Sequence, residues 1–150
     1  MKLRPYQETA ADFLFERDRA LILAPVGAGK TAITLTAMQD MILRGEVKRF
    51  LVLAPKRVCT SVWPVEGVKW APLLKVAVAV GTPKQRAAAF ASSAQVVVTN
   101  YENLPTGKFD AVVFDELTRL KNPSGKRFKD LLKFLKPIEI RWGLTDSFTS

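Results

Sequence analysis

The chain has 150 residues, of which 48% are hydrophobic and 25% charged, a balance that suits one globular domain with a buried core. It contains no histidine and only one cysteine, Cys59, which excludes internal disulfides, histidine zinc sites, and Ser-His-Asp or Cys-His catalysis within the chain. Its net charge of +9 favours a polyanionic partner, a nucleic acid or a nucleotide. The chain has neither an apolar run near the roughly 18 residues of a membrane span nor a signal-peptide pattern, so we expect a cytoplasmic protein.

Short apolar runs alternate with helical patterns along the chain. Residues 5–17 predict a helix that begins at Pro5, and residues 20–25 predict a buried strand. The later predicted elements are helix 30–45 ended by Gly45, strand 49–55, helix 60–71 with Pro64 in its first turn, strand 73–81, helix 82–93 capped by Thr82, strand 94–100, a helical turn at 101–105, strand 109–116, helix 124–136 capped by Ser124, and strand 138–145. This alternation predicts an α/β fold with a mostly parallel sheet and helices on both faces.

A glycine-rich turn follows the first predicted strand in "LILAPVGAGKT", residues 21–31. Gly27 and Gly29 let backbone N–H groups approach phosphate oxygens, and the N-terminus of the next helix adds unpaired amides. Lys30 can reach the β- and γ-phosphates, and the Thr31 hydroxyl can bind Mg²⁺. Although Ala24 stands where the strict P-loop motif has glycine, the pattern predicts an ATP·Mg²⁺ site rather than an ordinary glycine turn. Its residues are Pro25, Val26, Gly27, Ala28, Gly29, Lys30 and Thr31.

Two acidic residues end the apolar strand "AVVFDE", residues 111–116. Open parallel sheets bind their ligands at the carboxyl ends of the strands, where Asp115 and Glu116 are expected. Asp115 would hold the Mg²⁺ and Glu116 would orient or deprotonate the attacking water, so with Lys30 they are the candidate catalytic residues. Two acids after a strand are also typical of a solvated helix start, and the P-loop upstream favours the catalytic interpretation.

Taken in order, the motifs resemble the first RecA-like domain of a superfamily 2 helicase, in particular the Swi/Snf-type DNA-dependent ATPases and their phage relatives. "LRPYQ" resembles the adenine-reading Q motif and implicates Gln7, while "APVGAGKT" resembles motif I and "VVFDELTRLKN" resembles motif II. "LVLAPKRV" resembles motif Ia, "VVVTNYENL" the next motif that contacts nucleic acid, and "RWGLT" motif III. The resemblance implies a single RecA-like P-loop NTPase domain over residues 1–150, in a bacterial or phage-infected cell.

The candidate nucleic-acid contacts follow two of the predicted strands. Lys56 and Arg57 would lie at the ligand-binding edge of the sheet and contact backbone phosphates, of DNA more than RNA. The resemblance also implicates Thr99, Asn100 and Tyr101, a run that is equally consistent with a helix cap.

Three further features have less specific interpretations. The basic run "RLKNPSGKRFK", residues 119–129, is either a solvated helix face or a nucleic-acid surface. Trp63 and Trp70 lie seven residues apart, and we expect both in the core. Thr118 departs from the family's motif II, which puts the usual coupling of hydrolysis to DNA in doubt, and Asp146 replaces a glycine of motif III.

The resemblance also implies that hydrolysis takes place between two RecA-like domains, the second of which supplies arginines. Such arginines are worth about 10³–10⁵ in rate in related phosphoryl-transfer enzymes. No second RecA-like domain is encoded in residues 1–150, so we expect efficient hydrolysis only with a second domain supplied elsewhere. The alternatives are a truncated product or excised domain of a Snf-type helicase, a subunit completed in trans or by self-association, and a non-catalytic nucleotide- or DNA-binding regulator of a full motor.

Overall fold

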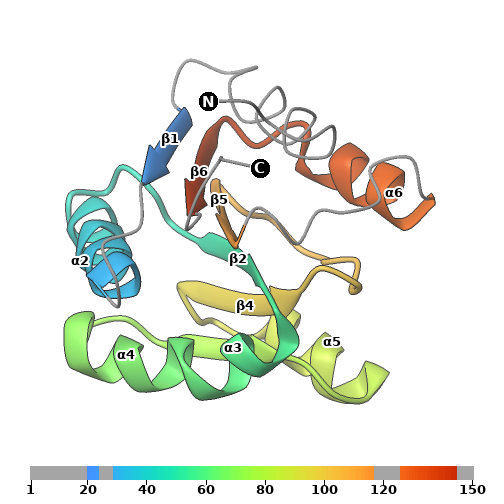
Figure 1. Ribbon diagram of the computed structural model, residues 1–150, viewed down its shortest axis with the longest axis horizontal. Coiled ribbons are helices and arrows are strands. Elements are labelled where there is room, and N and C mark those ends of the chain that lie inside the picture. Colours follow the sequence, from blue (N-terminus) through green and yellow to red (C-terminus); the bar gives the residue numbers. More distant parts are fainter. Residues whose placement is uncertain (1–19, 24–28, 117–125, 145–150) are drawn as a thin grey trace.

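A parallel sheet forms the centre of the protein in the computed structural model, which describes residues 20–23, 29–116 and 126–144 (Figure 1). In spatial order its strands are β1 (Ala20–Leu23), β6 (Ile140–Leu144), β5 (Ala111–Asp115), β2 (Phe50–Ala54), β4 (Val96–Asn100) and β3 (Val76–Ala79). Every described strand pair is parallel. The predicted α/β architecture is therefore confirmed, while the helix predicted at 5–17 lies outside the described residues.

Helices cover both faces of this sheet, as the alternation of elements predicts. They are α2 (Gly29–Leu43), α3 (Lys56–Ser61), α4 (Trp63–Trp70), α5 (Pro83–Ala91) and α6 (Lys126–Leu135). Helices α2, α3 and α4 lie on one face of the sheet, and α5 and α6 lie on the other (Figure 1). Their buried side chains belong to the two separate core clusters on these faces. Of the helices that the structure describes, none is long and apolar enough to cross a membrane.

The segment after β2 differs from its predicted form. Instead of one helix over 60–71, the chain forms α3 directly after Pro55, and α4 after a break at Val62. Pro64 explains the break, because it has no N–H to continue the hydrogen bonds of α3 and is accommodated in the first turn of a new helix. Lys56 and Arg57 therefore begin a helix and do not end a strand. Likewise, residues 101–103 form a hydrogen-bonded turn rather than a helical one.

Two predicted helix ends are confirmed. Gly45 has a φ of 77°, and the N–H groups of Gly45 and Glu46 donate to carbonyls of the last turn of α2. This left-handed residue closes the helix as a Schellman motif, in which glycine avoids the strain of a Cβ. At α5, Thr82 and Gln85 form a reciprocal capping box.

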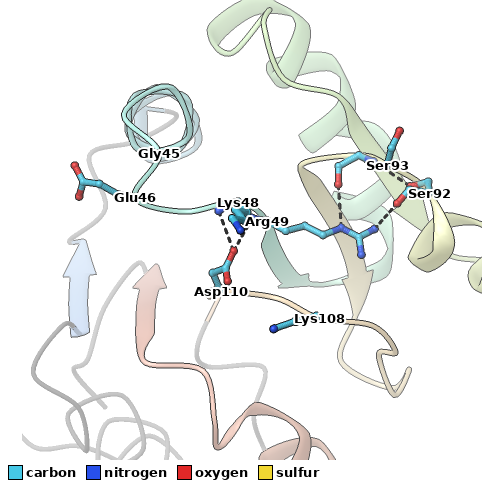
Figure 2. Close-up of a pocket in the computed structure, with 9 residues that line it drawn as sticks. Gly45, Glu46, Lys48, Arg49, Ser92, Ser93, Lys108 and Asp110 are labelled. Carbon is cyan, nitrogen blue, oxygen red and sulfur yellow. Dashed lines mark hydrogen bonds between the residues drawn. The ribbon is translucent and has the colours of Figure 1, made fainter.

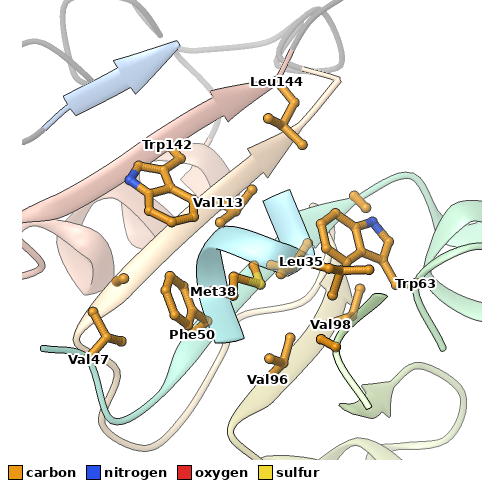
Figure 3. Close-up of a cluster of buried hydrophobic side chains, with 14 of the residues drawn as sticks. Leu35, Met38, Val47, Phe50, Trp63, Val96, Val98, Val113, Trp142 and Leu144 are labelled. Carbon is orange, nitrogen blue, oxygen red and sulfur yellow. The ribbon is translucent and has the colours of Figure 1, made fainter. Parts of the chain in front are cut away.

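The core on the α2 face holds two of the three tryptophans (Figure 3). Leu35 and Met38 of α2 are fully buried against the sheet, and Trp142 of β6 packs on the Phe50 ring with a centroid separation of 5.3 Å. Trp63 is fully buried as expected, but the expectation for Trp70 is wrong. It ends α4, is 43% exposed and lines a groove of about 880 Å³ beside α2.

Arg49 joins elements at the amino edge of the sheet, beside a pocket of about 420 Å³ (Figure 2). Its guanidinium lies 4.8 Å from the centre of the Phe109 ring, and the Asp110 carboxylate accepts its backbone N–H. The same guanidinium donates to three backbone carbonyls, those of Phe90, Ser92 and Ala94. One side chain thus attaches the end of α5 to the start of β2.

We expect Arg49→Lys to lower the free energy of unfolding by about 2 kcal/mol, because an ammonium keeps the charge but cannot reproduce the planar fork of donors. Urea unfolding measures this difference. The matched control is Arg44→Lys, at a side chain that is 64% exposed, where a change below about 0.5 kcal/mol is expected. Equal effects of the two substitutions would contradict the structural role of Arg49.

Candidate functional site

The carboxyl ends of the parallel strands bring the candidate residues to one edge of the sheet. Asp115, the last residue of β5, is in register with Leu144 of β6, and Ala54 of β2 is in register with Asn100 of β4. The segments that begin here include α3 and the turn after β4. This is the edge at which open α/β sheets bind ligands.

Asp115 is the buried centre of this edge, with 2% of its surface exposed. Side chains alternate along a strand, so Asp115 points to the same face as Val113, toward α2, α3 and α4. Its Oδ1 lies 3.3 Å from Nζ of Lys30, and its Oδ2 accepts a hydrogen bond of 2.9 Å from the indole N–H of Trp63. The buried charge is thus offset by an ion pair and a hydrogen bond, as a buried carboxylate requires.

Lys30 and Thr31 lie in the first turn of α2. The Lys30 side chain is 14% exposed and reaches Asp115 across this turn, and Thr31 is 6% exposed. Thr34 stabilises the turn by donating its hydroxyl to the Lys30 carbonyl at 2.7 Å. The helix start therefore presents an ammonium and a hydroxyl beside the β5 carboxylate. Other predicted nucleotide contacts, Gln7, Pro25, Val26, Gly27 and Ala28, lie outside the described residues.

Glu116 adopts an unusual backbone conformation directly after Asp115. Its φ is 55°, in the left-handed region that a residue with a Cβ enters at some cost. The Tyr101 hydroxyl donates to the Asp115 carbonyl at 2.6 Å and so fixes the peptide that joins the two acids. This turn separates their roles, since Asp115 stays buried while Glu116 is half-buried at the edge.

The candidate nucleic-acid contacts divide into two groups. Lys56 and Arg57 are exposed in the first turn of α3. The other three have partners within the protein: the buried Thr99 hydroxyl donates to the Ala79 carbonyl at 2.7 Å, Asn100 bonds to Glu102 and Asn103, and Tyr101 bonds to Asp115. In this structure these three stabilise the edge, and the exposed cations of the set are Lys56 and Arg57.

Trp63 is the site residue that sequence reasoning missed. Its ring was expected in the core, where it lies, but its N–H reaches the Asp115 carboxylate 52 positions along the chain. The available signal was chemical: a buried indole N–H needs an acceptor, and few acceptors are expected inside a sheet of apolar strands. Which acceptor it meets is decided only by the fold.

Cys59 lies beneath the same carboxylate on α3. It is fully buried, and burial raises its pKa to about 12, with a smaller contribution from the negative charge of Asp115. Its thiol contacts the Ala54 carbonyl at 3.5 Å. The thiol is therefore neutral, and Cys59 serves as a packing residue and not as a nucleophile.

Asp115 and Thr31 are the described residues that could hold the Mg²⁺ that accompanies nucleotides in P-loop proteins. Asp115 Oδ1 is buried and, although Lys30 lies nearby, accepts no hydrogen bond from the described residues. Within the same part of the chain no three His, Cys, Asp or Glu side chains cluster around a possible metal position. One carboxylate and one hydroxyl fit Mg²⁺ that brings its own waters and phosphate ligands, and do not fit a metal held by protein alone.

Comparisons with known proteins show the family of this chain. Residues 6–147 match the model of the SNF2-related domain family. The chain is 39% identical over 155 aligned positions to protein p41 of Acyrthosiphon pisum secondary endosymbiont phage 1, covering 93% of this chain and 34% of that protein.

Two solved structures share the fold of this chain. The Sulfolobus solfataricus SWI2/SNF2 ATPase core in complex with dsDNA is similar with a TM-score of 0.69 and 26% identity, over 98% of this chain and 32% of that one. The UvsW helicase from bacteriophage T4 shares the fold, with a TM-score of 0.62 and 18% identity over 98% of this chain and 53% of that one. The chain thus spans about a third of the length of p41 and of the Sulfolobus core.

The raised pKa of Cys59 predicts slow alkylation of the folded protein. At pH 9, half of an ordinary thiol of pKa 9.0 is ionised, whereas a thiol of pKa about 12 is almost entirely protonated. We expect iodoacetamide to react at least about 100-fold more slowly with the folded chain than with the urea-unfolded chain. The folded protein holds the thiol proton more tightly than the unfolded chain, so the contribution of Cys59 to the free energy of unfolding is complete below pH 9 and is lost as pH rises toward 12. Equal alkylation rates would contradict the burial of Cys59.

Proposed function

Since the chain belongs to the SNF2-related domain family and has the RecA-like fold of its ATPase cores, we propose that it binds ATP·Mg²⁺ at the carboxyl edge and acts as the first domain of a Swi/Snf-type DNA translocase. The observation that carries the proposal is the pairing of Lys30 with the buried Asp115 at 3.3 Å. A lysine at a helix start beside a strand-end carboxylate is the arrangement that P-loop enzymes use for a triphosphate and its metal.

In this proposal Lys30 changes partners when nucleotide binds. Its ammonium now faces one carboxylate oxygen, and the greater negative charge of a triphosphate attracts it toward the β- and γ-phosphates. Asp115 Oδ1 then becomes available to the metal, which Asp115 and the Thr31 hydroxyl would hold. When bound, Mg²⁺ neutralises charge that develops on the phosphate oxygens.

Glu116 is proposed to act on the attacking water. Its left-handed backbone turns it away from the buried direction of Asp115, and its half-buried position gives it access to solvent. A carboxylate there can orient water and accept its proton. Asp115 has no such access, because its two oxygens already face Lys30 and Trp63.

Duplex DNA is proposed to contact the exposed start of α3. Lys56 and Arg57 supply two positive charges at the edge where α3 begins, and the net charge of +9 favours a polyanion. The similar Sulfolobus core is described in complex with dsDNA. Contacts of this kind go to phosphates and are therefore weakly dependent on base sequence and strongly dependent on salt.

A second RecA-like domain is proposed to complete the ATPase. Protein p41 and the Sulfolobus core are each about three times as long as the part aligned here, which leaves room in them for a further domain. In phosphoryl transfer an arginine from outside the P-loop unit stabilises the transition state. We therefore propose that residues 1–150 bind nucleotide by themselves and hydrolyse it fast only with that domain.

The central test compares Lys30→Ala with Glu116→Gln. Removal of the ammonium should weaken ATP binding by at least about 100-fold, since its charge-assisted hydrogen bonds to phosphate can no longer form. Glu116→Gln should bind ATP like the unchanged chain and lose the slow hydrolysis that the unchanged chain shows without a second domain, because the amide cannot accept the proton. Calorimetric titration with ATP·Mg²⁺ and phosphate release measure the two effects.

Lys84→Ala is the control for this test, since Lys84 is exposed on α5 at the other face of the sheet. Undiminished ATP affinity in Lys30→Ala would refute the P-loop assignment. Rapid DNA-stimulated hydrolysis by the unchanged 150-residue chain would instead refute the need for a second domain.

For DNA binding we expect the double substitution Lys56→Ala and Arg57→Ala to weaken binding at all sequences. The slope of log affinity against log salt concentration should fall by about one for each phosphate that the protein no longer neutralises. Fluorescence anisotropy of a labelled duplex across a salt series measures both. The matched control is Lys129→Ala with Lys133→Ala, on the exposed face of α6. A larger decrease in affinity in that control would place the DNA on α6 and contradict the assignment to α3.

A further inference from the structure

Asp115 is held by two side chains outside the helix that supplies Lys30. The indole N–H of Trp63 donates to Oδ2 at 2.9 Å, and both side chains are almost completely buried. The hydroxyl of Tyr101 donates to the Asp115 carbonyl at 2.6 Å. One bond therefore fixes the carboxylate and the other fixes the backbone that carries it.

The Trp63 bond decides which carboxylate oxygen is left for other partners. With Oδ2 occupied by the indole, Oδ1 is the oxygen that faces Lys30 at 3.3 Å. Without the indole N–H, the ion pair with Lys30 restrains the carboxylate, since Oδ1 accepts no hydrogen bond from the described residues. When Lys30 moves to the phosphates, as proposed above, the carboxylate can then rotate about its Cβ–Cγ bond. A ligand oxygen that rotates offers a metal a poorer geometry, which is why outer-shell donors to ligating carboxylates matter.

One of these donors belongs to a segment where nucleic-acid contacts were predicted, and the other directly follows such a segment. Trp63 begins α4 and is separated from Ser61, the end of α3, by Val62 alone; α3 begins with the exposed pair Lys56 and Arg57. Tyr101 belongs to the turn after β4. A displacement of either segment therefore acts directly on the position of Asp115.

We propose that Trp63 is a positioning residue for Asp115, and that its bond transmits nucleic-acid binding on α3 to the metal position. The proposal rests on the proposed function and names the regulation of that site. Trp63 does not touch the nucleotide; it acts through the carboxylate. The ring itself fills the core beneath α4, so packing and positioning must be separated by experiment.

Trp63→Phe keeps an aromatic ring in the core and removes the N–H. The measurement is the binding of a fluorescent ATP analogue at increasing Mg²⁺ concentrations. We expect the Mg²⁺ concentration that gives half of the Mg²⁺-dependent increase in binding to rise about 10-fold, the lower end of the usual effect of an outer-shell substitution. Nucleotide binding in EDTA should change less than about 2-fold, since the P-loop is untouched. In the unchanged chain duplex DNA should lower the Mg²⁺ requirement, and in Trp63→Phe that effect should disappear.

Trp142→Phe is the matched control, because Trp142 is another buried tryptophan of the same core cluster, and its indole has no acceptor among the described residues. It should leave the Mg²⁺ requirement unchanged. If both variants weaken nucleotide binding to the same extent, and do so equally with Mg²⁺ and in EDTA, Trp63 is a packing residue and the proposal is wrong. Two results would overturn the proposed transmission from DNA to the metal position. One is that DNA still lowers the Mg²⁺ requirement of Trp63→Phe, and the other is that DNA does not lower it in the unchanged chain.

A second readout needs no hydrolysis or metal. The chain has three tryptophans, so ¹⁵N spectra give three indole signals, and Trp63→Phe identifies the one from Trp63. Duplex DNA should shift this signal in the unchanged chain and not in the Lys56→Ala, Arg57→Ala variant. If the chemical shift of the Trp63 indole does not change at saturating DNA, the proposal is contradicted. Failure of Lys30→Ala to weaken ATP binding would sink the proposed function instead, so the two failures are distinguishable.

Discussion

The structure of the site depends on one buried carboxylate. Burying a charge at a sheet edge is costly unless hydrogen bonds and an opposite charge offset it. Asp115 obtains both, from Lys30 at 3.3 Å and from the Trp63 indole at 2.9 Å. Lys30 belongs to α2 and Trp63 to α4, so the two interactions that stabilise the charge also connect both helices to the end of β5. The function proposed for the edge depends on this convergence.

The parallel sheet makes the convergence possible. Because strand side chains alternate, Val113 and Asp115 face α2 to α4, while Val112 and Phe114 face α5 and α6. A shift of one residue in β5 would turn the carboxylate away from Lys30 and place it in the other core. The amino edge is stabilised separately by Arg49, which attaches the end of α5 to β2. The carboxyl edge, which holds Asp115, thus belongs to a sheet whose amino edge is stabilised by the hydrogen bonds of Arg49.

Backbone strain is confined, among the described residues, to the junction of the two acids. Glu116 has a positive φ that is unfavourable for a residue with a Cβ, and the preceding carbonyl is held by Tyr101. The same junction separates a buried acid that suits metal binding from a half-buried one that suits proton transfer. Tyr101 and Trp63 therefore have related roles, since each supports Asp115 from a position in, or directly after, a segment with predicted nucleic-acid contacts.

Local sequence determined the elements and the chemical types at the site. Apolar runs specified the strands, Gly45 and Thr82 specified helix ends, and the P-loop pattern and strand-end acids specified Lys30, Thr31 and Asp115 as candidates, because each signal lies within a few residues. Pro64 signalled a helix start, but the separate α3 before it was missed. Only the tertiary structure decided that Trp63 bonds to Asp115, that Trp70 is half exposed, and that Thr99 and Asn100 bond inward. Hydrogen-bond partners and burial depend on segments distant in sequence, so no local pattern specifies them.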